Sequence, residues 1–199
     1  MTHTRYWVAG CAISLLCAGT LSMASAADPA LEGAVRMAVS PQAQTWLADP
    51  AVVAAVKSQN ARNAGIAQSK IDEMDNRWKA AAKAGGVNPA FDEVSSNAVS
   101  KQLKQVVAGS GGKIVEILLM DDHGLNVGQT AGTSDFWQGD EPKWQKVFTG
   151  NADLYMTDPE KDDKTGAMLT EASVPVLDPA GKQKIGVAMI VLDTAKLAR

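Results

Sequence analysis

A glycine-rich stretch near the middle of the chain separates two halves with different sequence patterns. Gly109, Ser110, Gly111 and Gly112 follow one another directly. Before them apolar residues recur at helical spacing, and after them short apolar segments alternate with turn signals, as is typical of strands. Helices followed by strands predict an α+β fold with a mainly antiparallel sheet. The chain has no glycine-rich phosphate loop, so the sequence does not support a nucleotide-binding fold.

The first half predicts three helical segments. The first covers 28–47, with a break near Pro41. A long helix is predicted over 50–83, because Asp49-Pro50 supplies an N-cap residue followed by proline at the first helical position. A third helix is predicted over 89–107.

The later half of the long helix carries one apolar stripe. Its residues are three or four positions apart, so they lie on one side of the helix. We expect the stripe to pack against the rest of the domain and to bury Trp78. The helix of a second copy, in a homodimer, is the alternative partner. The stripe consists of Ile71, Met74, Trp78 and Ala81.

The second half predicts five strands and one short helix. Two turns of Asp-x-x-Gly type, Asp121–Gly124 and Asp178–Gly181, favour hairpin connections. The predicted strands are 113–120, 125–130, 152–158, 167–176 and 184–193, and the short helix is 141–148.

Alternation within the strands assigns side chains to the two faces of the sheet. Glu171 and Ser173 share one face, whereas Ala172 points to the other. In the preceding strand Tyr155 and Thr157 share a face. A buried Glu171 would need a partner, so it is either a pocket residue or a sign that its face is in contact with water.

The stretch 133–144, the Trp-rich loop, contains two Trp, one Phe and four ionisable residues. Aromatic rings beside a few polar groups form the lining that small-molecule pockets use. The alternative is a loop whose Trp residues only cap the sheet. We predict one ligand cavity lined by Trp137, Trp144, Tyr155 and Glu171, with Ser173 on the same sheet face and Thr133, Ser134 and Asp135 at the rim.

The N-terminus has the pattern of a secretory signal peptide. Arg5 precedes an apolar run, 8–23, and the run is followed by Ala24-Ser25-Ala26. We expect cleavage after Ala26 and a periplasmic protein, with an uncleaved membrane anchor as the alternative. The predicted division is a signal peptide at 1–26, a helical segment at 27–49 and one domain at 50–199. Both cysteines lie in the leader, so the exported chain would have no thiol.

Several kinds of chemistry are disfavoured by composition. The net charge is −3, and an acidic chain is a poor nucleic-acid binder. After the leader the single histidine is His123, which lies in a turn, so neither a catalytic triad nor a His/Cys metal site is expected. The acidic run 158–163 lacks the ligand spacing of a calcium loop and favours a solvated loop. We interpret Asp140-Glu141 as helix-capping acids, and we expect no cofactor.

Together these features resemble an extracellular Cache sensor domain, which has a PAS-like fold. The resemblance spans roughly 50–193, and its most specific part is the Trp-rich loop. The residues that carry it are Leu119–Val127, Thr133–Glu141 with Lys143-Trp144, Ser173–Asp178 with Gly181 and Ile185–Val187, and Ile71, Asp72, Met74, Asp75 and Trp78 of the long helix.

The resemblance implies a long N-terminal helix packed on a five-stranded antiparallel sheet. It also implies a pocket between the sheet and the loops above it, for carboxylates, amino acids, amines or other small polar metabolites. The sequence to Arg199 shows no signalling module, so we expect a separate membrane receptor as partner or a free binding protein.

Three functions remain open at this point. The leading hypothesis is a periplasmic, sensor-like binding domain without catalytic activity. The first alternative is a protein-interaction module with a vestigial pocket, which would use the helical stripe to hold a receptor. The last is a hydrolase, which would need two carboxylates in one cleft at a separation of ~5–10 Å.

Overall fold

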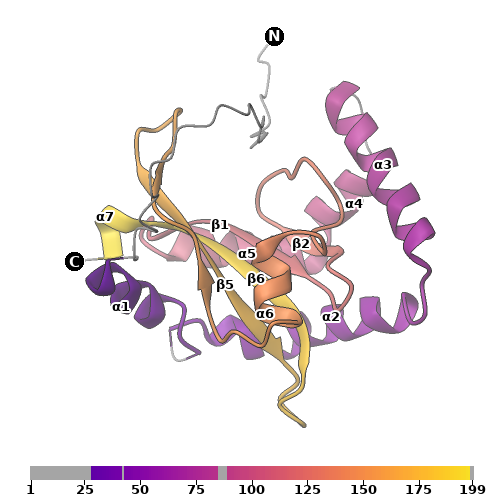
Figure 1. Ribbon diagram of the computed structural model, residues 1–199, viewed down its shortest axis with the longest axis horizontal. Coiled ribbons are helices and arrows are strands. Elements are labelled where there is room, and N and C mark those ends of the chain that lie inside the picture. The colour runs from indigo at the N-terminus through magenta and orange to yellow at the C-terminus, as the bar shows by residue number, and fades with distance from the viewer. Residues whose placement is uncertain (1–27, 42, 85–88, 198–199) are drawn as a thin grey trace, which may run out of the picture.

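The computed structural model describes residues 28–41, 43–84 and 89–197. They form helices around one antiparallel sheet, whose strand order is β2-β1-β6-β5-β3, with β4 also paired to β5 (Figure 1). The strands are β1 (Ile114–Met120), β2 (Asn126–Gln129), β3 (Tyr155–Met156), β4 (Glu160–Lys161), β5 (Met168–Leu177) and β6 (Lys184–Asp193). The predicted α+β class with an antiparallel sheet is confirmed.

The helices precede the sheet, except for two short ones. Figure 1 shows α6 in front of the sheet and α5 behind it, while α3 extends away from the sheet. The helices are α1 (Pro29–Ala38), the 3-10 helix η1 (Thr45–Ala48), α2 (Pro50–Arg62), α3 (Gln68–Ala84), α4 (Pro89–Ser96), α5 (Ala98–Gly109), α6 (Pro142–Phe148) and α7 (Thr194–Leu197).

The prediction of one continuous helix over 50–83 is wrong. It begins as expected, because the Asp49 side chain accepts a hydrogen bond from the Ala51 N–H and Pro50 occupies the first turn. The helix ends at Arg62, since Gly65 has a φ of 73°, a conformation that side chains disfavour. The chain then starts α3 in a new direction, which allows α3 to contact the Trp-rich loop.

The third predicted helix is also divided. Asn97 ends α4 and caps α5, because its Oδ1 accepts a hydrogen bond from the Ser100 N–H at 2.8 Å. The Asn97 Nδ2 donates to the Val127 carbonyl at 2.9 Å, which fixes this break against β2. Tertiary contact therefore selects the capping role of Asn97.

Of the predicted strand 152–158 only Tyr155–Met156 is paired, as β3, and the unpredicted strand β4 follows it, so the sheet has six strands in the described part of the chain instead of five. β3 and β4 are separated by Thr157-Asp158-Pro159. Proline has no N–H for a ladder hydrogen bond, and it interrupts the pairing along the edge of β5.

The larger core lies between the sheet and the helices α1, α2 and α5. The inward residues of β5 are Ala172, Val174 and Val176, as the alternation predicted, and all three are buried. Leu154 and Met156 also pack on this core, whereas Tyr155 packs on the opposite side. Other members include Val35, Val52, Val56, Leu103, Ile117, Leu119, Ile190 and Leu192.

A smaller core covers the opposite face of the sheet, which we call the α6 face. It consists of Leu118, Met120, Trp144, Val147, Val187 and Met189, with Phe148, Tyr155 and Val191 packed against it. The C-terminal end of α6 is held by Lys184, whose Nζ donates to the carbonyls of Val147 and Phe148 at 2.9 and 2.6 Å. The short helix is therefore fixed over the sheet.

In the described part of the chain, none of the helices combines the length and the apolarity that a membrane span requires. The predicted signal peptide at 1–26 lies outside the described residues. The predicted helical segment at 27–49 contains α1 and η1, which are separated around Pro41 as expected.

Candidate functional site

Strand register places a set of polar side chains on the α6 face. Glu116 of β1 and Glu171 of β5 both pair with Val191 of β6, one from each side. At a strand spacing of 4.7–4.9 Å, their Cα atoms lie ~10 Å apart. In the neighbouring row Ser173 lies between Met189 and Tyr155. Glu171 and Ser173 are two residues apart, so their side chains share this face.

Three of these groups have no hydrogen-bond partner. The Ser173 side chain is fully buried, and its Oγ has no donor or acceptor within reach among the described residues. Within the same described part of the chain, the carboxylates of Glu116 and Glu171 make no hydrogen bond and no ion pair. We call Glu116, Glu171 and Ser173 the acceptor cluster. A buried polar atom without a partner is costly, and among the three groups this applies to the Ser173 hydroxyl, whereas the two glutamates are only partly buried.

A lysine on α6 faces the same region. Lys143 forms an ion pair with Glu141 at 3.0 Å, and its side chain is only 15% exposed. Burial alone would lower the pKa of Lys143, but the charges of Glu141, Glu171 and Asp135 outweigh burial and raise it. Lys143 therefore stays charged and is already partnered by Glu141.

Burial raises the pKa of Glu116 to about 7. The neighbouring charge of Glu171 contributes to this raised pKa, and the charge of Lys143 opposes it. Burial also raises the pKa of Glu141, although Lys143 counteracts that effect. The α6 face therefore holds a carboxyl group that changes its charge near neutral pH.

Replacing Glu116 with Gln is expected to stabilise the protein at pH 8 and to have little effect at pH 5. Between the ordinary pKa of 4.5 and the folded value of about 7, the folded state keeps a proton that the unfolded state has lost. The free energy of unfolding of the wild type therefore falls as pH rises through this window, by on the order of 3 kcal/mol. Glutamine does not titrate, so the variant should lack this fall.

Urea unfolding of both proteins at pH 5 and pH 8 measures the difference. The matched control is Glu160→Gln, because Glu160 is an exposed acid on the same sheet. An equal gap between wild type and Glu116→Gln at both pH values would mean that Glu116 is not desolvated.

The Trp-rich loop is ordered by contacts with α3 and with the β1–β2 turn. The Asp75 carboxylate accepts hydrogen bonds from the backbone N–H groups of Phe136 and Trp137 at 2.9 and 3.1 Å. The Trp78 ring stacks on Phe136 with centroids 5.2 Å apart, and its Nε1 donates to the Thr133 carbonyl. The apolar stripe of α3 thus docks on this loop, and Trp78 is buried as predicted.

The two tryptophans of the loop have different surroundings. Trp144 is buried in the α6-face core, and its Nε1 donates to the Asp121 carbonyl at 3.0 Å. Trp137 is partly buried, and its Nε1 donates to the His123 carbonyl at 2.8 Å. Both indoles therefore fasten the loop to the Asp121–Gly124 turn from different sides.

The sequence-predicted site residues form two groups. Trp144, Tyr155, Glu171 and Ser173 share the α6 face. Thr133, Ser134, Asp135 and Trp137 belong to the loop: the Thr133 hydroxyl donates to the Asp135 carbonyl, and the Ser134 hydroxyl donates to the Asp135 carboxylate. Asp135 connects the two groups electrostatically, because its charge acts on Lys143. The prediction that all of them border one cavity stays a prediction.

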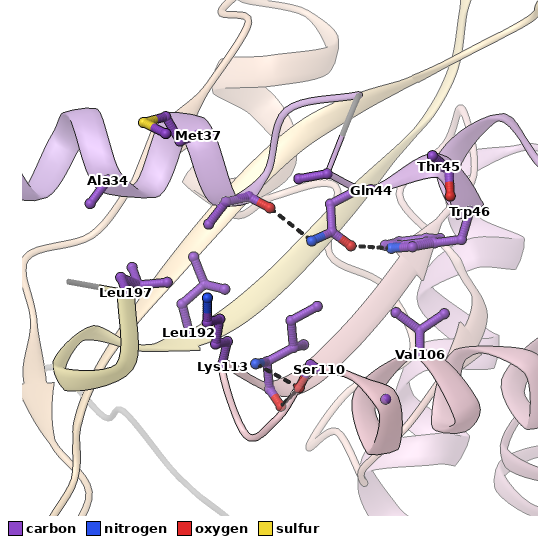
Figure 2. Close-up of a pocket in the computed structure, with 14 residues that line it drawn as sticks. Ala34, Met37, Gln44, Thr45, Trp46, Val106, Ser110, Lys113, Leu192 and Leu197 are labelled. Atoms are coloured by element: carbon purple, nitrogen blue, oxygen red, sulfur yellow. Dashed lines mark hydrogen bonds between the residues drawn. The ribbon is translucent and has the colours of Figure 1, made fainter. Parts of the chain in front are cut away.

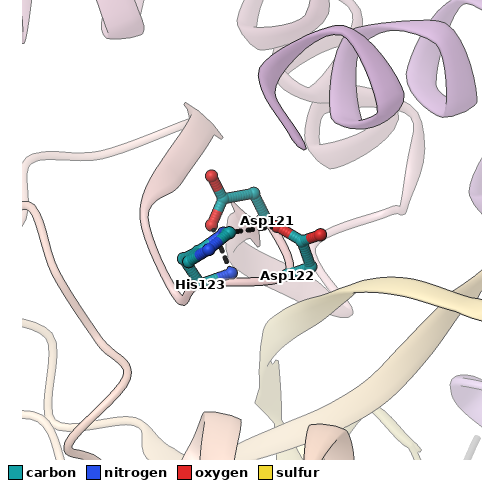
Figure 3. Close-up of side chains that lie close together, drawn as sticks. All are labelled: Asp121, Asp122 and His123. Carbon is teal, nitrogen blue, oxygen red and sulfur yellow. Dashed lines mark hydrogen bonds and ion pairs between the residues drawn. The ribbon is translucent and has the colours of Figure 1, made fainter. Parts of the chain in front are cut away.

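Asp121, Asp122 and His123 bring three potential metal ligands together in the β1–β2 turn (Figure 3). The buried Asp121 carboxylate already accepts four hydrogen bonds, from the N–H groups of His123 and Leu125 and from the side-chain amides of Gln59 and Asn63. Asp122 contacts the His123 ring at 2.6 Å. We therefore interpret these three side chains as a structural cluster that holds the β1–β2 turn against the C-terminal end of α2.

A cavity of about 690 Å³ lies on the other side of the sheet from the α6 face, between α1, η1, α5 and α7 (Figure 2). Its walls include Met37, Val106 and Leu192. Gln44 accepts from the Trp46 Nε1 at 2.5 Å and donates to the Ala38 carbonyl, whereas the Lys113 side chain in the lining forms no hydrogen bond or ion pair with the described residues. We favour the acceptor cluster for ligand binding, because it includes a fully buried hydroxyl without a partner.

Sequence reasoning missed Glu116 and Lys143 as site residues. The available signal for Glu116 was a single acid inside an otherwise apolar strand, Ile114–Met120. For Lys143 the signal was weaker, because a lysine in the first turn of a surface helix is common. Only the packing of α6 shows that this lysine is enclosed.

No protein-family model matches the chain, and no curated protein sequence does either. In structure, the chain is similar to the ligand-binding domain of the Pseudomonas aeruginosa amino acid chemoreceptor PctC in complex with GABA. The sequence identity is 17% and the TM-score 0.40, over 65% of this chain and 54% of that one.

Two further chemoreceptor domains are similar in the same way. The ligand-binding domain of Pseudomonas fluorescens CtaA in complex with L-serine has 20% identity and a TM-score of 0.36, over 65% of this chain and 52% of that one. The sensory domain of Campylobacter jejuni Tlp3 with isoleucine bound has 14% identity and a TM-score of 0.36, over 85% and 65%. This chain spans less than two thirds of each. All three are ligand-binding or sensory domains of chemoreceptors.

Proposed function

We propose that this protein is an exported, sensor-like domain that binds a small polar metabolite on the α6 face. The observation that carries the proposal is the acceptor cluster, in which the buried Ser173 hydroxyl and two glutamate carboxylates lack protein partners. A ligand that donates hydrogen bonds would satisfy them. The apolar surround of Leu118, Met189 and Val191 would enclose its remainder.

The interaction module is less well supported by the α6 face. A vestigial pocket would be expected to fill with apolar side chains or to pair its polar groups internally. Its predicted docking surface, the stripe of α3, is also engaged, because Ile71 and Trp78 are buried within this chain. A homodimer through the stripe is disfavoured for the same reason.

A carboxylate hydrolase keeps one specific observation in its favour. Glu116 and Glu171 flank Val191, and the pKa of Glu116 is raised to about 7, as a general acid requires. Hydrolysis of chromogenic glycosides that is abolished by Glu171→Gln would support this function over binding. We place binding first, because a bound ligand would also pair the buried Ser173 hydroxyl, which the hydrolase does not explain.

The proposed location is the periplasm, after cleavage behind Ala26. The mass of the exported protein checks this part, since the chain should begin at Ala27 or Asp28. A membrane receptor as signalling partner remains part of the proposal, because a separate binding domain needs a receiver.

A thermal-shift screen of the chain from Ala27 onward against metabolites tests the function. A ligand at 100 times its Kd should add about 2.7 kcal/mol of stability. Glu171→Gln should reduce this stabilisation, whereas the exposed control Glu160→Gln should preserve it. Trp137→Ala, with the fold verified by circular dichroism, tests whether the Trp-rich loop contributes to binding. A screen without any stabilising compound would contradict the proposal.

A further inference from the structure

We infer that the cavity between α1, η1, α5 and α7 is a second binding site, which takes a monoanionic amphiphile such as a medium-chain carboxylate. The inference goes beyond the proposed function, because this cavity and the α6 face lie on opposite sides of the sheet. Its volume of about 690 Å³ is in the range of small-molecule pockets. The cavity is therefore large enough for an acyl chain and its headgroup.

Most of the cavity wall is apolar, and part of that apolar surface is left uncovered. Met37 of α1 is 76% exposed, and Leu197 of α7 is half-buried, although both belong to the lining. An apolar chain in the cavity would remove this surface from water. The apolar lining includes Ala34, Met37, Trp46, Val106, Leu192 and Leu197.

One side chain of the lining is charged. Lys113 directly precedes β1, and its ammonium group forms no hydrogen bond or ion pair with the described residues. Figure 2 shows the Lys113 side chain extending toward α1. Two other polar side chains are engaged, since Gln44 accepts from Trp46 and the Ser110 hydroxyl donates to the Val107 carbonyl at 2.8 Å. Lys113 is therefore available to the headgroup of a ligand.

The charges on the adjoining elements favour an anionic headgroup. Glu32 of α1 is paired with Arg36 at 2.8 Å, and Asp193 at the end of β6 is paired with Lys196 at 3.0 Å. These acids are balanced within the protein, whereas Lys113 is not. A carboxylate would form a charge-assisted hydrogen bond with the Lys113 ammonium group. A single lysine balances one negative charge, so the headgroup is a monoanion.

The cavity also connects the first and the last helix of the described chain. α1 and α7 lie side by side at one end of the fold (Figure 1). A ligand that contacts Met37 and Leu197 needs both helices in place, so its binding should stabilise their position on the sheet. We therefore expect such a ligand to raise the melting temperature.

Calorimetry with octanoate, decanoate and decylamine at pH 7 tests the site, with each compound below the concentration at which it forms micelles. Each buried methylene should contribute about 4-fold in affinity, so decanoate should bind about 15-fold more tightly than octanoate. Decanoate should bind about 3-fold more tightly than decylamine or better, because the exposed Lys113 attracts one headgroup and repels the other.

Two variants with matched controls locate the ligand. Lys113→Glu should reverse the preference, so that decylamine binds more tightly than decanoate. Lys101→Glu makes the same charge change at an exposed position of α5 outside the lining, and it should keep the preference of the wild type. Ala34→Phe fills the cavity and should weaken decanoate binding by about 10-fold or more. Ala54→Phe, at an exposed position of α2, should not. Circular dichroism verifies the fold of each variant.

The outcomes separate this inference from the proposed function. A wild type that does not bind decanoate overturns the inference, and so does a Lys113→Glu variant that still prefers the carboxylate. Glu171→Gln should bind decanoate as the wild type does, and a loss of binding there would place decanoate on the α6 face and overturn the second site. A metabolite screen without a ligand for the α6 face, together with the expected decanoate pattern, contradicts the proposed function and supports the second site.

Discussion

Replacing Trp78 with alanine is expected to lower the free energy of unfolding by about 3–5 kcal/mol, the usual loss for a core aromatic side chain. Trp78 is 2% exposed, stacks on Phe136 and packs against Phe91 with ring centroids 5.4 Å apart. Its Nε1 also donates to the Thr133 carbonyl at 3.1 Å, so the substitution leaves that carbonyl without this donor. The loop and α3 should loosen together.

Urea unfolding followed by circular dichroism measures this loss. The matched control is Arg77→Ala, which removes a large neighbouring side chain that is 76% exposed. It should change stability by no more than about 0.5 kcal/mol. A loss below about 1 kcal/mol for Trp78→Ala would show that α3 does not pack on the loop in solution.

Replacing Asp121 with alanine is the second substitution with a large expected effect. Its carboxylate accepts from two backbone N–H groups, of His123 and Leu125, and from the amides of Gln59 and Asn63. Each buried donor left without an acceptor costs about 1–3 kcal/mol. Because the costs of neighbouring donors are not additive, we expect a net loss of about 3–5 kcal/mol.

Asp121→Asn separates charge from shape in the same experiment. Asparagine retains one acceptor oxygen but places an NH2 group where the second carboxylate oxygen accepted two hydrogen bonds. The loss in free energy of unfolding should therefore lie between zero and that of Asp121→Ala. Asp122→Asn is the control, because Asp122 is partly exposed and, among the described residues, its carboxylate is hydrogen-bonded to the His123 ring alone. If Asp121→Ala proved as mild as Asp122→Asn, the turn would not depend on the buried carboxylate.

The position of this turn also explains how the α6 face is connected to the helices. Trp144 donates to the Asp121 carbonyl, whereas Gln59 and Asn63 of the α2 end donate to the carboxylate of the same residue. Gly124, with a φ of 82°, leaves room for the backbone of Gly139, because a Cβ atom there would lie 2.5 Å from the Gly139 nitrogen. The turn therefore joins the Trp-rich loop, the sheet and α2.

Local patterns in the sequence were sufficient for the class of fold and for the faces of the strands. Asp49-Pro50 predicted the start of α2, since a cap acts within one turn. Alternation predicted that Glu171 and Ser173 oppose Ala172, because successive side chains of a strand point to opposite faces. Helical spacing predicted the buried Trp78. Each of these properties depends on residues that are close together in the chain.

Tertiary structure decided which distant residues meet. The division at Asn97 depends on the contact of Asn97 with Val127 of β2, which no local pattern contains. The break after Arg62 coincides with the left-handed Gly65, and the contact of Asn63 with Asp121 holds the chain there. Glu116 and Glu171 lie in one row of the sheet only because β6 lies between β1 and β5, in the register that places Val191 opposite both. Register between strands is set by packing and turn geometry across the whole sheet. The sequence alone therefore determined that Glu171 and Ser173 share a face, whereas the tertiary structure determined that Glu116 joins them.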